Sequence, residues 1–290
     1  MIIMSNISLF DETKNILKEN NLSLKRSLGQ NYLIDDFKRK KILNFAQLNK
    51  NDEVLEIGSG IGTLSLKIAE KVKKLIAIEQ DTKIFNILSK RVKEIGFNNI
   101  ELINKDALKV DFPKFNKIVS NLPYQISSPI TFKLLKYDFD LAILTYQKEF
   151  AIRMIGKVNT KDYSRLTAML HFKANIEFLD DLSPNSFFPQ PKVQSSVIKL
   201  SPLFNEEFKR YEKEYSQISK AIFQHKNKKV MNSLIDSRII LGHNNKKEVH
   251  KFLDEISSDN EVNNLLNQRV IKTTPNDIFT LSKQLKSFLK

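Results

Sequence analysis

The stretch Glu53-Val54-Leu55-Glu56-Ile57-Gly58-Ser59-Gly60-Ile61-Gly62 decides the fold that this sequence predicts. Its first five residues are typical of a buried strand, and apolar periodicity indicates a helix from about Thr63 to Lys71. Glycines between the two let the backbone approach a ligand, and the N–H groups of the helix N-terminus suit an anion. Thr63 stands where the G-x-G-x-x-G dinucleotide fingerprint needs its third glycine. The stretch therefore predicts an α/β sheet. As the ligand group bound at the glycine loop, it favours a carboxylate, such as that of methionine in S-adenosylmethionine, over a pyrophosphate.

Polar residues follow the next strands of the predicted sheet. These strands are expected over 74–78, 100–103 and 117–120. Glu79 ends the first strand, where a ribose diol would be held, and Asp106 follows the second, where its carboxylate can accept from an adenine amino group. Asn121 ends the third strand. Because ligands of open α/β sheets bind outside the carboxyl ends of the strands, these side chains together predict a nucleotide-cofactor site.

The segment Asn121-Leu122-Pro123-Tyr124 offers a side-chain amide, a backbone carbonyl and an aromatic face. The Asn121 amide oxygen and the Leu122 carbonyl can accept the two N–H groups of an exocyclic amino group, while Tyr124 stacks on the base. Two acceptors are needed because the lone pair of adenine N6 is delocalised into the ring and is a poor nucleophile. The alternative interpretation is that Asn121 caps the next helix and Pro123 only ends the strand.

Composition excludes several classes of protein. A chain of 290 residues with 41% hydrophobic content supports one large domain and a small one. Cysteine is absent and the four histidines lack metal-ligand spacing, so we expect no metal centre. The absence of a membrane-length apolar run and of a signal peptide indicates a soluble cytoplasmic protein. The net charge of +14 favours a polyanionic partner, although lysine-rich genomes also give basic proteins.

The rest of the chain divides at a proline-rich segment. Further helices are expected over 11–19, 83–93, 128–135, 148–155 and 165–172, and further strands over 139–146, 174–179 and 193–200. Four of the eight prolines fall between Pro184 and Pro202, which indicates a rigid loop and then a domain border. Residues 1–202 are therefore predicted to form the catalytic domain, and residues 203–290 a helical, RNA-binding domain.

Basic and aromatic residues lie near the candidate ligand-binding segments. Lys25 and Arg26 precede the loop 27–34, whose amide and aromatic residues suit closure over a ligand, although Gly-Gln-Asn also makes ordinary turns. Phe187 and Phe188 on the proline-rich loop could supply the second face of a base sandwich, or both could belong to the core. The helical domain carries a cluster that could follow a phosphate backbone, formed by Lys226, Lys228 and Lys229.

With these residues in view, the chain resembles the KsgA-type small-subunit ribosomal RNA adenine dimethyltransferases over roughly residues 25–285. The similarity rests on the motifs Leu28-Gly29-Gln30-Asn31-Tyr32-Leu33, Glu56-Ile57-Gly58-Ser59-Gly60, Glu79, Asp106-Ala107, Asn121-Leu122-Pro123-Tyr124 and Phe187 to Ser196. The resemblance implies a Rossmann-like class I methyltransferase sheet with a small C-terminal all-helical domain. It also implies S-adenosylmethionine-dependent methylation at N6 of two adjacent adenosines near the 3′ end of small-subunit rRNA, during ribosome biogenesis.

The resemblance also assigns roles to individual residues. Around the target base it places Asn121, Leu122, Pro123, Tyr124 and Phe187. The cofactor residues that it implies are Gln30, Asn31, Leu33, Gly58, Gly60, Glu79, Asp106, Ala107 and Asn121. The expected partner is the small ribosomal subunit or its rRNA, without a membrane or a metal, and we expect a monomer.

Two positions depart from the family pattern, and other functions compete. Tyr32 replaces a frequent phenylalanine, and the cluster 225–229 has lysines where the family has arginines, which keeps charge but loses bidentate contacts. A large-subunit rRNA adenine methyltransferase of the macrolide-resistance type shares the motifs, but the long helical C-terminal part favours the small subunit. A ribosome-assembly factor with secondary methylation is a second alternative. A nicotinamide-dependent dehydrogenase would leave residues 121–124 unexplained.

Overall fold

The computed structural model describes residues 7–22 and 30–290, and these form two compact units. The first unit contains residues up to 151 together with 176–202, and the second contains 152–175 and 203–290. The predicted division placed residues 152–175 in the catalytic domain, whereas the structure groups them with the C-terminal helices. The reason is that buried tyrosines join residues 152–175 to the C-terminal helices. Such long-range contacts leave no pattern in the local sequence.

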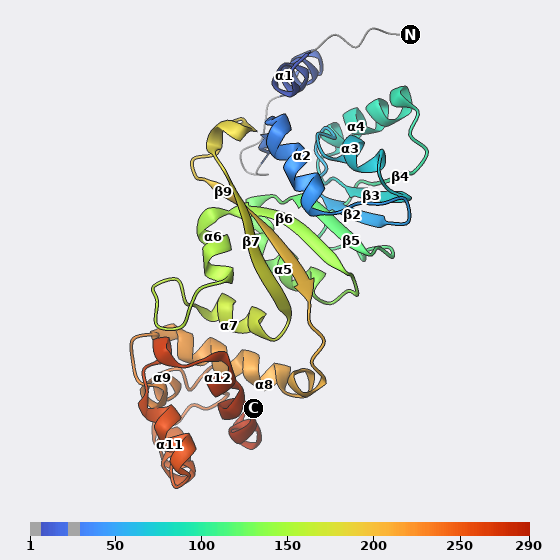
Figure 1. The fold of residues 1–290 in the computed structure, drawn as a ribbon. Helices are drawn as coiled ribbons and strands as arrows, with labels where there is room; N and C mark the ends of the chain where they lie inside the picture. The colour runs from blue at the N-terminus through green and yellow to red at the C-terminus, as the bar shows by residue number, and fades with distance from the viewer. Residues whose placement is uncertain (1–6, 23–29) are drawn as a thin grey trace. The chain divides into compact units, whose positions relative to one another are not determined.

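The first unit is built on a seven-stranded sheet with the order β4-β3-β2-β5-β6-β9-β7 (Figure 1). The strands are β2 Glu53–Ile57, β3 Lys74–Ile78, β4 Ile100–Ile103, β5 Lys117–Asn121, β6 Leu141–Gln147, β7 Ala174–Leu182 and β9 Ser195–Pro202. Neighbouring strands from β4 to β6 are parallel, and β9 is antiparallel to β6. This is the predicted class I methyltransferase sheet, and β3 and β4 have the predicted bounds.

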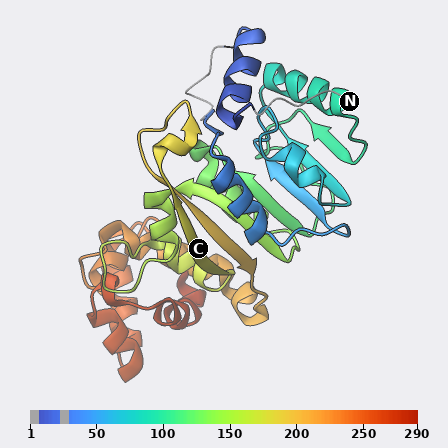
Figure 2. The same ribbon diagram turned by 45° about the horizontal axis from the view of Figure 1, so that its top comes forward.

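The helices of the first unit bury apolar side chains against the sheet or, for the N-terminal helix, against the segment around Tyr32 and the helix after β3. They are α1 Leu9–Glu19, α2 Asp36–Phe45, α3 Ser65–Ala69, α4 Thr82–Ile95, α5 Ser127–Leu134 and α6 Lys148–Met154, with 3-10 turns η2 Tyr124–Ile126 and η3 Pro184–Ser186. Figures 1 and 2 both show α2 lying along one face of the strands. Its Ile42 joins Ile68 of α3, Val54 of β2 and Val119 of β5 in one core cluster. This packing holds the glycine loop between β2 and α3 at the edge of a rigid sheet.

A two-stranded ribbon connects two distant segments of the first unit. Strand β1, Tyr32–Leu33, pairs antiparallel with β8, Phe187–Phe188. The register sets Leu33 opposite Phe187 and Tyr32 opposite Phe188. Since successive strand residues face opposite sides, the first pair joins the core cluster of the sheet and the second faces α1 and α4. Both segments were predicted as loops, because two-residue strands carry no periodicity.

The second unit packs helices around aromatic side chains. Its helices are α7 Arg165–His171, α8 Glu206–Ile222, α9 Val230–Asp236, α10 Lys246–Ile256, α11 Asn260–Asn267 and α12 Pro275–Gln284, with η4 Phe223–His225, η5 Val270–Lys272 and η6 Lys286–Phe288. Phe172 stacks on Phe208 with ring centroids 4.8 Å apart. The Tyr215 hydroxyl donates to the Ala168 carbonyl at 2.9 Å, which ties α7 to α8. In the part of the chain described, no helix is long and apolar enough to cross a membrane.

Candidate active site

The glycine loop after β2 adopts backbone angles that require glycine. Gly58 has φ +74° and Gly60 has φ +57°, both in the left-handed region. A Cβ atom on Gly60 would lie 2.8 Å from the Tyr32 ring, and one on Gly58 would lie 3.0 Å from Pro123. The N–H of Gly58 donates to the Ile78 carbonyl at 2.8 Å, which ties the loop to β3. The loop therefore needs glycine at both positions, for its backbone angles and for its close packing on Tyr32 and Pro123.

Glu79, directly after β3, is held by backbone donors. Its carboxylate accepts from the N–H of Gly60 at 2.9 Å and from the N–H of Asp81 at 2.9 Å. Burial raises the pKa of Glu79 and the Asp81 carboxylate adds to the rise, while these N–H groups oppose it. Asp81 also caps α4 by accepting from the N–H of Lys83 at 2.9 Å. The predicted ribose-binding position is therefore a preoriented carboxylate in the pocket wall.

Glu56 is a second carboxyl group in the same wall; it belongs to the predicted strand and motif, but no role was predicted for it. It is 2% exposed, and burial raises its pKa to about 8. A Ser65 hydroxyl opposes this rise and the nearby Glu79 carboxylate adds to it. Its Oε2 atom has no hydrogen-bond partner among the described residues. A carboxyl inside an otherwise apolar strand just before a glycine loop was the available signal.

The turn after β4 is braced by a lysine from α5. The Asp106 carboxylate accepts from the N–H of Leu108 at 2.9 Å. The Lys133 ammonium donates to the Ala107 carbonyl at 2.9 Å and also to the Val110 carbonyl. It lies 4.5 Å from the centre of the Phe112 ring, within cation–π range. Asp106 and Ala107 therefore occupy a turn whose shape depends on a distant side chain.

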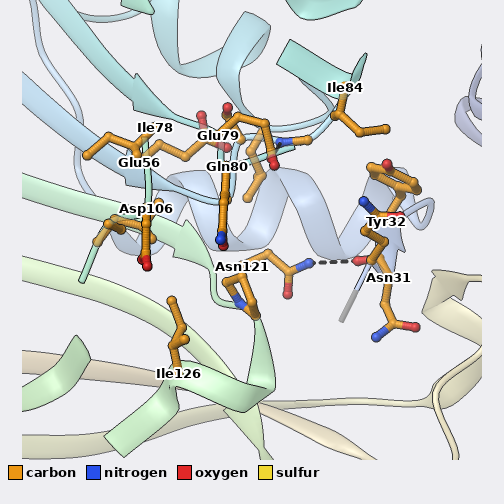
Figure 3. A pocket seen from close by; sticks show the side chains of 18 of the residues that line it. Asn31, Tyr32, Glu56, Ile78, Glu79, Gln80, Ile84, Asp106, Asn121 and Ile126 are labelled. Atoms are coloured by element: carbon orange, nitrogen blue, oxygen red, sulfur yellow. Dashed lines mark hydrogen bonds between the residues drawn. The ribbon is translucent and has the colours of Figure 1, made fainter. Parts of the chain in front are cut away.

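Asn121 is oriented by one hydrogen bond that leaves its acceptor free. Its Nδ2 donates to the Asn31 carbonyl at 3.0 Å (Figure 3). This donor fixes which end of the amide is the oxygen, and Oδ1 is buried without a hydrogen-bond partner among the described residues. An unpaired buried acceptor costs free energy, so its retention points to a donor supplied by a ligand.

One pocket brings most of the predicted cofactor residues together. Figure 3 shows Glu79, Asp106 and Asn121 reaching it from the ends of three strands. The predicted residues that line it are Gln30, Asn31, Gly58, Gly60, Glu79, Asp106, Ala107, Asn121 and Pro123. The pocket is also lined by residues that were not predicted as ligand contacts, namely Tyr32, Glu56, Ile57, Ser59, Thr63, Leu64, Ile78, Gln80, Ile84, Lys105, Gln125 and Ile126. Most of these are neighbours of motif residues, so their places follow from the turn geometry rather than from a pattern.

Comparison with known proteins identifies the family of this fold and pocket. The family model of ribosomal RNA adenine dimethylases matches residues 21–274.

The chain belongs to the ribosomal RNA adenine dimethylase family.

A relative from Methanothermobacter thermautotrophicus, described as a probable ribosomal RNA small subunit methyltransferase A, is 44% identical over 282 residues, covering 96% of this chain and 97% of the relative. The crystal structure of a dimethyladenosine transferase from Plasmodium falciparum is 31% identical with a TM-score of 0.76, covering 88% of this chain and 97% of that one. The crystal structure of the 23S rRNA methyltransferase ErmE is 26% identical with a TM-score of 0.61, covering 88% of this chain and all of that one.

Several residues expected at the dimethylase site lie elsewhere. Leu33 and Phe187 are each 1% exposed and pack in the core cluster of the sheet, because the β1–β8 register turns both side chains inward. Contact between Phe187 and a base would require the ribbon to move. The Leu122 side chain is also buried, which does not bear on the role predicted for its backbone carbonyl, and Tyr124 is half-buried outside the pocket that Asn121 lines. Of the two aromatic residues expected around a base, only Tyr124 retains partial exposure.

The predicted RNA-binding lysines of this dimethylase already have partners. Lys226 donates to the Lys161 carbonyl at 2.9 Å, and Lys228 pairs with Asp236 at 2.8 Å. Lys229 donates to the Asn267 side chain at 3.1 Å. Lys25 and Arg26, the other predicted contacts, lie outside the described residues.

Proposed function

We propose that this dimethylase transfers methyl groups from S-adenosylmethionine to N6 of two adjacent adenosines near the 3′ end of small-subunit rRNA. The observation that carries the proposal is the Asn121 amide, whose oxygen is unpaired while its nitrogen is held by the Asn31 carbonyl. Membership of the dimethylase family supports the reaction class. The name of the Methanothermobacter relative, a small subunit methyltransferase, supports the choice of substrate.

The pocket residues fit S-adenosylmethionine group by group. Glu79 would accept from the ribose hydroxyls, and Asp106 would accept from the adenine amino group. The glycine loop lines the pocket, so the methionine end would lie beside the backbone of Gly58 and Gly60. The unpaired Oε2 of Glu56 is suited to the methionine ammonium. When bound, the cofactor supplies an electrophilic methyl group on a sulfonium.

The protein's own part in the reaction is to orient the target nitrogen. Asn121 Oδ1 and the Leu122 carbonyl would accept hydrogen bonds from the two N6–H groups, which would draw the amino group toward a pyramidal form and direct its lone pair at the methyl group. Tyr124 would stack on the base and hold its plane. A strong general base is unnecessary, because N6 becomes acidic when it is alkylated and can release its proton to water.

Two alternatives share the same site. A large-subunit rRNA adenine methyltransferase is less well supported, since both identity and TM-score are lower for ErmE than for the Plasmodium dimethyladenosine transferase. A role in ribosome assembly is compatible with enzymatic activity in the same protein. The unpaired Oδ1 atom of Asn121 argues against a purely non-catalytic role.

The proposal is tested by incubating the protein with labelled S-adenosylmethionine and undermethylated small subunits, with large-subunit RNA in parallel. Nucleosides are then released by nuclease and identified by mass spectrometry. We expect N6,N6-dimethyladenosine in the small-subunit sample alone. Label in large-subunit RNA would support the resistance-type alternative. Cofactor binding without any label would favour the assembly role.

A further inference from the structure

Tyr124 is held at the tip of its ring by a residue from a distant strand. Its hydroxyl lies 2.6 Å from the Ser195 hydroxyl, a normal distance for an O–H···O hydrogen bond. Tyr124 begins the 3-10 turn η2 just after β5, whereas Ser195 is the first residue of β9. The bond therefore joins the segment after one strand to the start of another strand 71 residues later.

The Ser195 end of this bond belongs to a rigid part of the sheet. Ser195 is fully buried and pairs with Gln147 in the β6–β9 ladder. The preceding carbonyl, of Gln194, accepts from the N–H of Lys148 at 2.9 Å. The following side chain, Ser196, donates to Asp181 at 2.8 Å. Both neighbours are tied to other elements, so Ser195 offers a fixed point to the half-buried Tyr124 ring.

We propose that Ser195 is a positioning residue for methyl transfer, which fixes the plane of the Tyr124 ring against the target adenine. This inference rests on the proposed function, in which Tyr124 stacks on the base. A tyrosine anchored at both Cα and hydroxyl does not need to be ordered when the base arrives. Asn121 is prepared in the same way, because the Asn31 carbonyl holds its amide. Both end residues of the segment 121–124 are thus preoriented by partners from other parts of the chain.

A purely structural role is the competing explanation. The Tyr124 hydroxyl is largely buried, which raises its pKa, and a buried hydroxyl needs a hydrogen-bond partner in any case. A structural bond would contribute to folding stability and leave the reaction unchanged. A positioning bond would also change the rate of transfer, and its effect would disappear once the Tyr124 hydroxyl is removed.

The test is a double-mutant cycle with Ser195→Ala, Tyr124→Phe and the combined variant. Single-turnover methylation of small subunits gives the rate, calorimetry gives cofactor affinity, and thermal unfolding gives stability. We expect each single change to slow transfer by about 3- to 10-fold, from the ordering cost of one side chain. The double variant should be no slower than either single one, and cofactor affinity should stay unchanged. Ser195→Thr, which keeps the hydroxyl, should restore most of the rate.

Ser196→Ala is the matched control, because Ser196 is its neighbour, is also fully buried and also makes one side-chain hydrogen bond. It should lower stability without slowing transfer. An active wild-type protein whose rate is unchanged by Ser195→Ala would overturn this inference alone. If the rate losses of the two single variants multiplied in the double variant, the inference would also be overturned, because the two residues would then act independently. A wild-type protein that forms no methylated adenosine would reject the proposed function and this inference with it.

Discussion

At the residue scale, Glu56 places a carboxyl with a pKa of about 8 in the wall of the cofactor pocket. Below pH 8 this group is neutral, and its ionised form is the one that attracts the methionine ammonium. Cofactor affinity should therefore rise with pH toward about 8, approaching tenfold per unit at most, and binding should release a proton. Calorimetry in buffers of different ionisation enthalpy measures that proton.

Glu56→Gln is the control for this prediction. The amide keeps the size of the side chain and removes the titration, so the pH dependence and the proton release should both be lost. Proton release that persists in this variant would assign the titration to another group, such as Glu79, whose pKa is also raised by burial.

Site residues at the ends of parallel strands could be predicted from the sequence. Glu79, Asp106 and Asn121 were predicted because polar residues at the carboxyl ends of parallel strands converge at one edge. No role was predicted for Glu56, because a carboxyl within an apolar strand indicates burial but does not by itself indicate which group of a ligand it would bind. Phe187 was assigned to the base by resemblance, and its inward orientation depends on the register with β1.

At the element scale, the turn that carries Asp106 depends on Lys133 of α5. Lys133→Met keeps the apolar stem and removes the ammonium, which leaves the Ala107 and Val110 carbonyls without this donor. An unsatisfied buried group costs about 1–3 kcal/mol, so cofactor affinity should fall by roughly 5- to 150-fold at most as the turn loosens. Calorimetric titration of the cofactor measures this loss.

Lys136→Met is the matched control for Lys133, since Lys136 is an exposed lysine three residues later. It should bind the cofactor like the wild type. Equal affinity in both variants would show that the turn keeps its shape without the lysine.

Element boundaries were predictable where apolar runs are bounded by polar residues or glycine. Strands β3 and β4 match the prediction residue for residue for this reason. Helix α2 was missed because four of its ten residues are basic and only Ile42 and Leu43 are buried, so its apolar stripe is too short to recognise. The β1–β8 ribbon forms only through long-range pairing, which no local pattern encodes.

At the scale of the whole molecule, the compact units do not follow chain order. Residues 152–175 belong with the C-terminal helices because buried tyrosines join them: Tyr163 donates to the Thr273 carbonyl at 2.7 Å, and Tyr215 donates to the Ala168 carbonyl. A change in composition near residue 203 indicates a domain border there. It carries no information about which earlier segment packs on the later helices.

The helical unit should contribute to RNA binding through counterion release. Replacing Lys226, Lys228 and Lys229 with alanine should weaken binding of small subunits and reduce the salt slope by up to about 0.9 per lost phosphate contact. The reduction should be below the three-contact maximum, because each lysine already has an intramolecular partner. Binding measured at several salt concentrations gives the slope.

A triple alanine variant at Lys83, Lys90 and Lys93 of α4 removes the same charge from exposed positions of the first unit. It should change the slope less. Equal slopes for the two triple variants would show that net charge, rather than the cluster at 226–229, sets the affinity.

The central claim is that Asn121 orients the target nitrogen and is not needed to hold the cofactor. The most direct measurement compares Asn121→Ala with the wild type for both cofactor affinity and single-turnover transfer. We predict that affinity stays within about threefold while transfer falls by roughly 10²- to 10³-fold, as for the loss of one preoriented transition-state contact. Loss of cofactor affinity in parallel with transfer would contradict the claim and assign Asn121 to the cofactor.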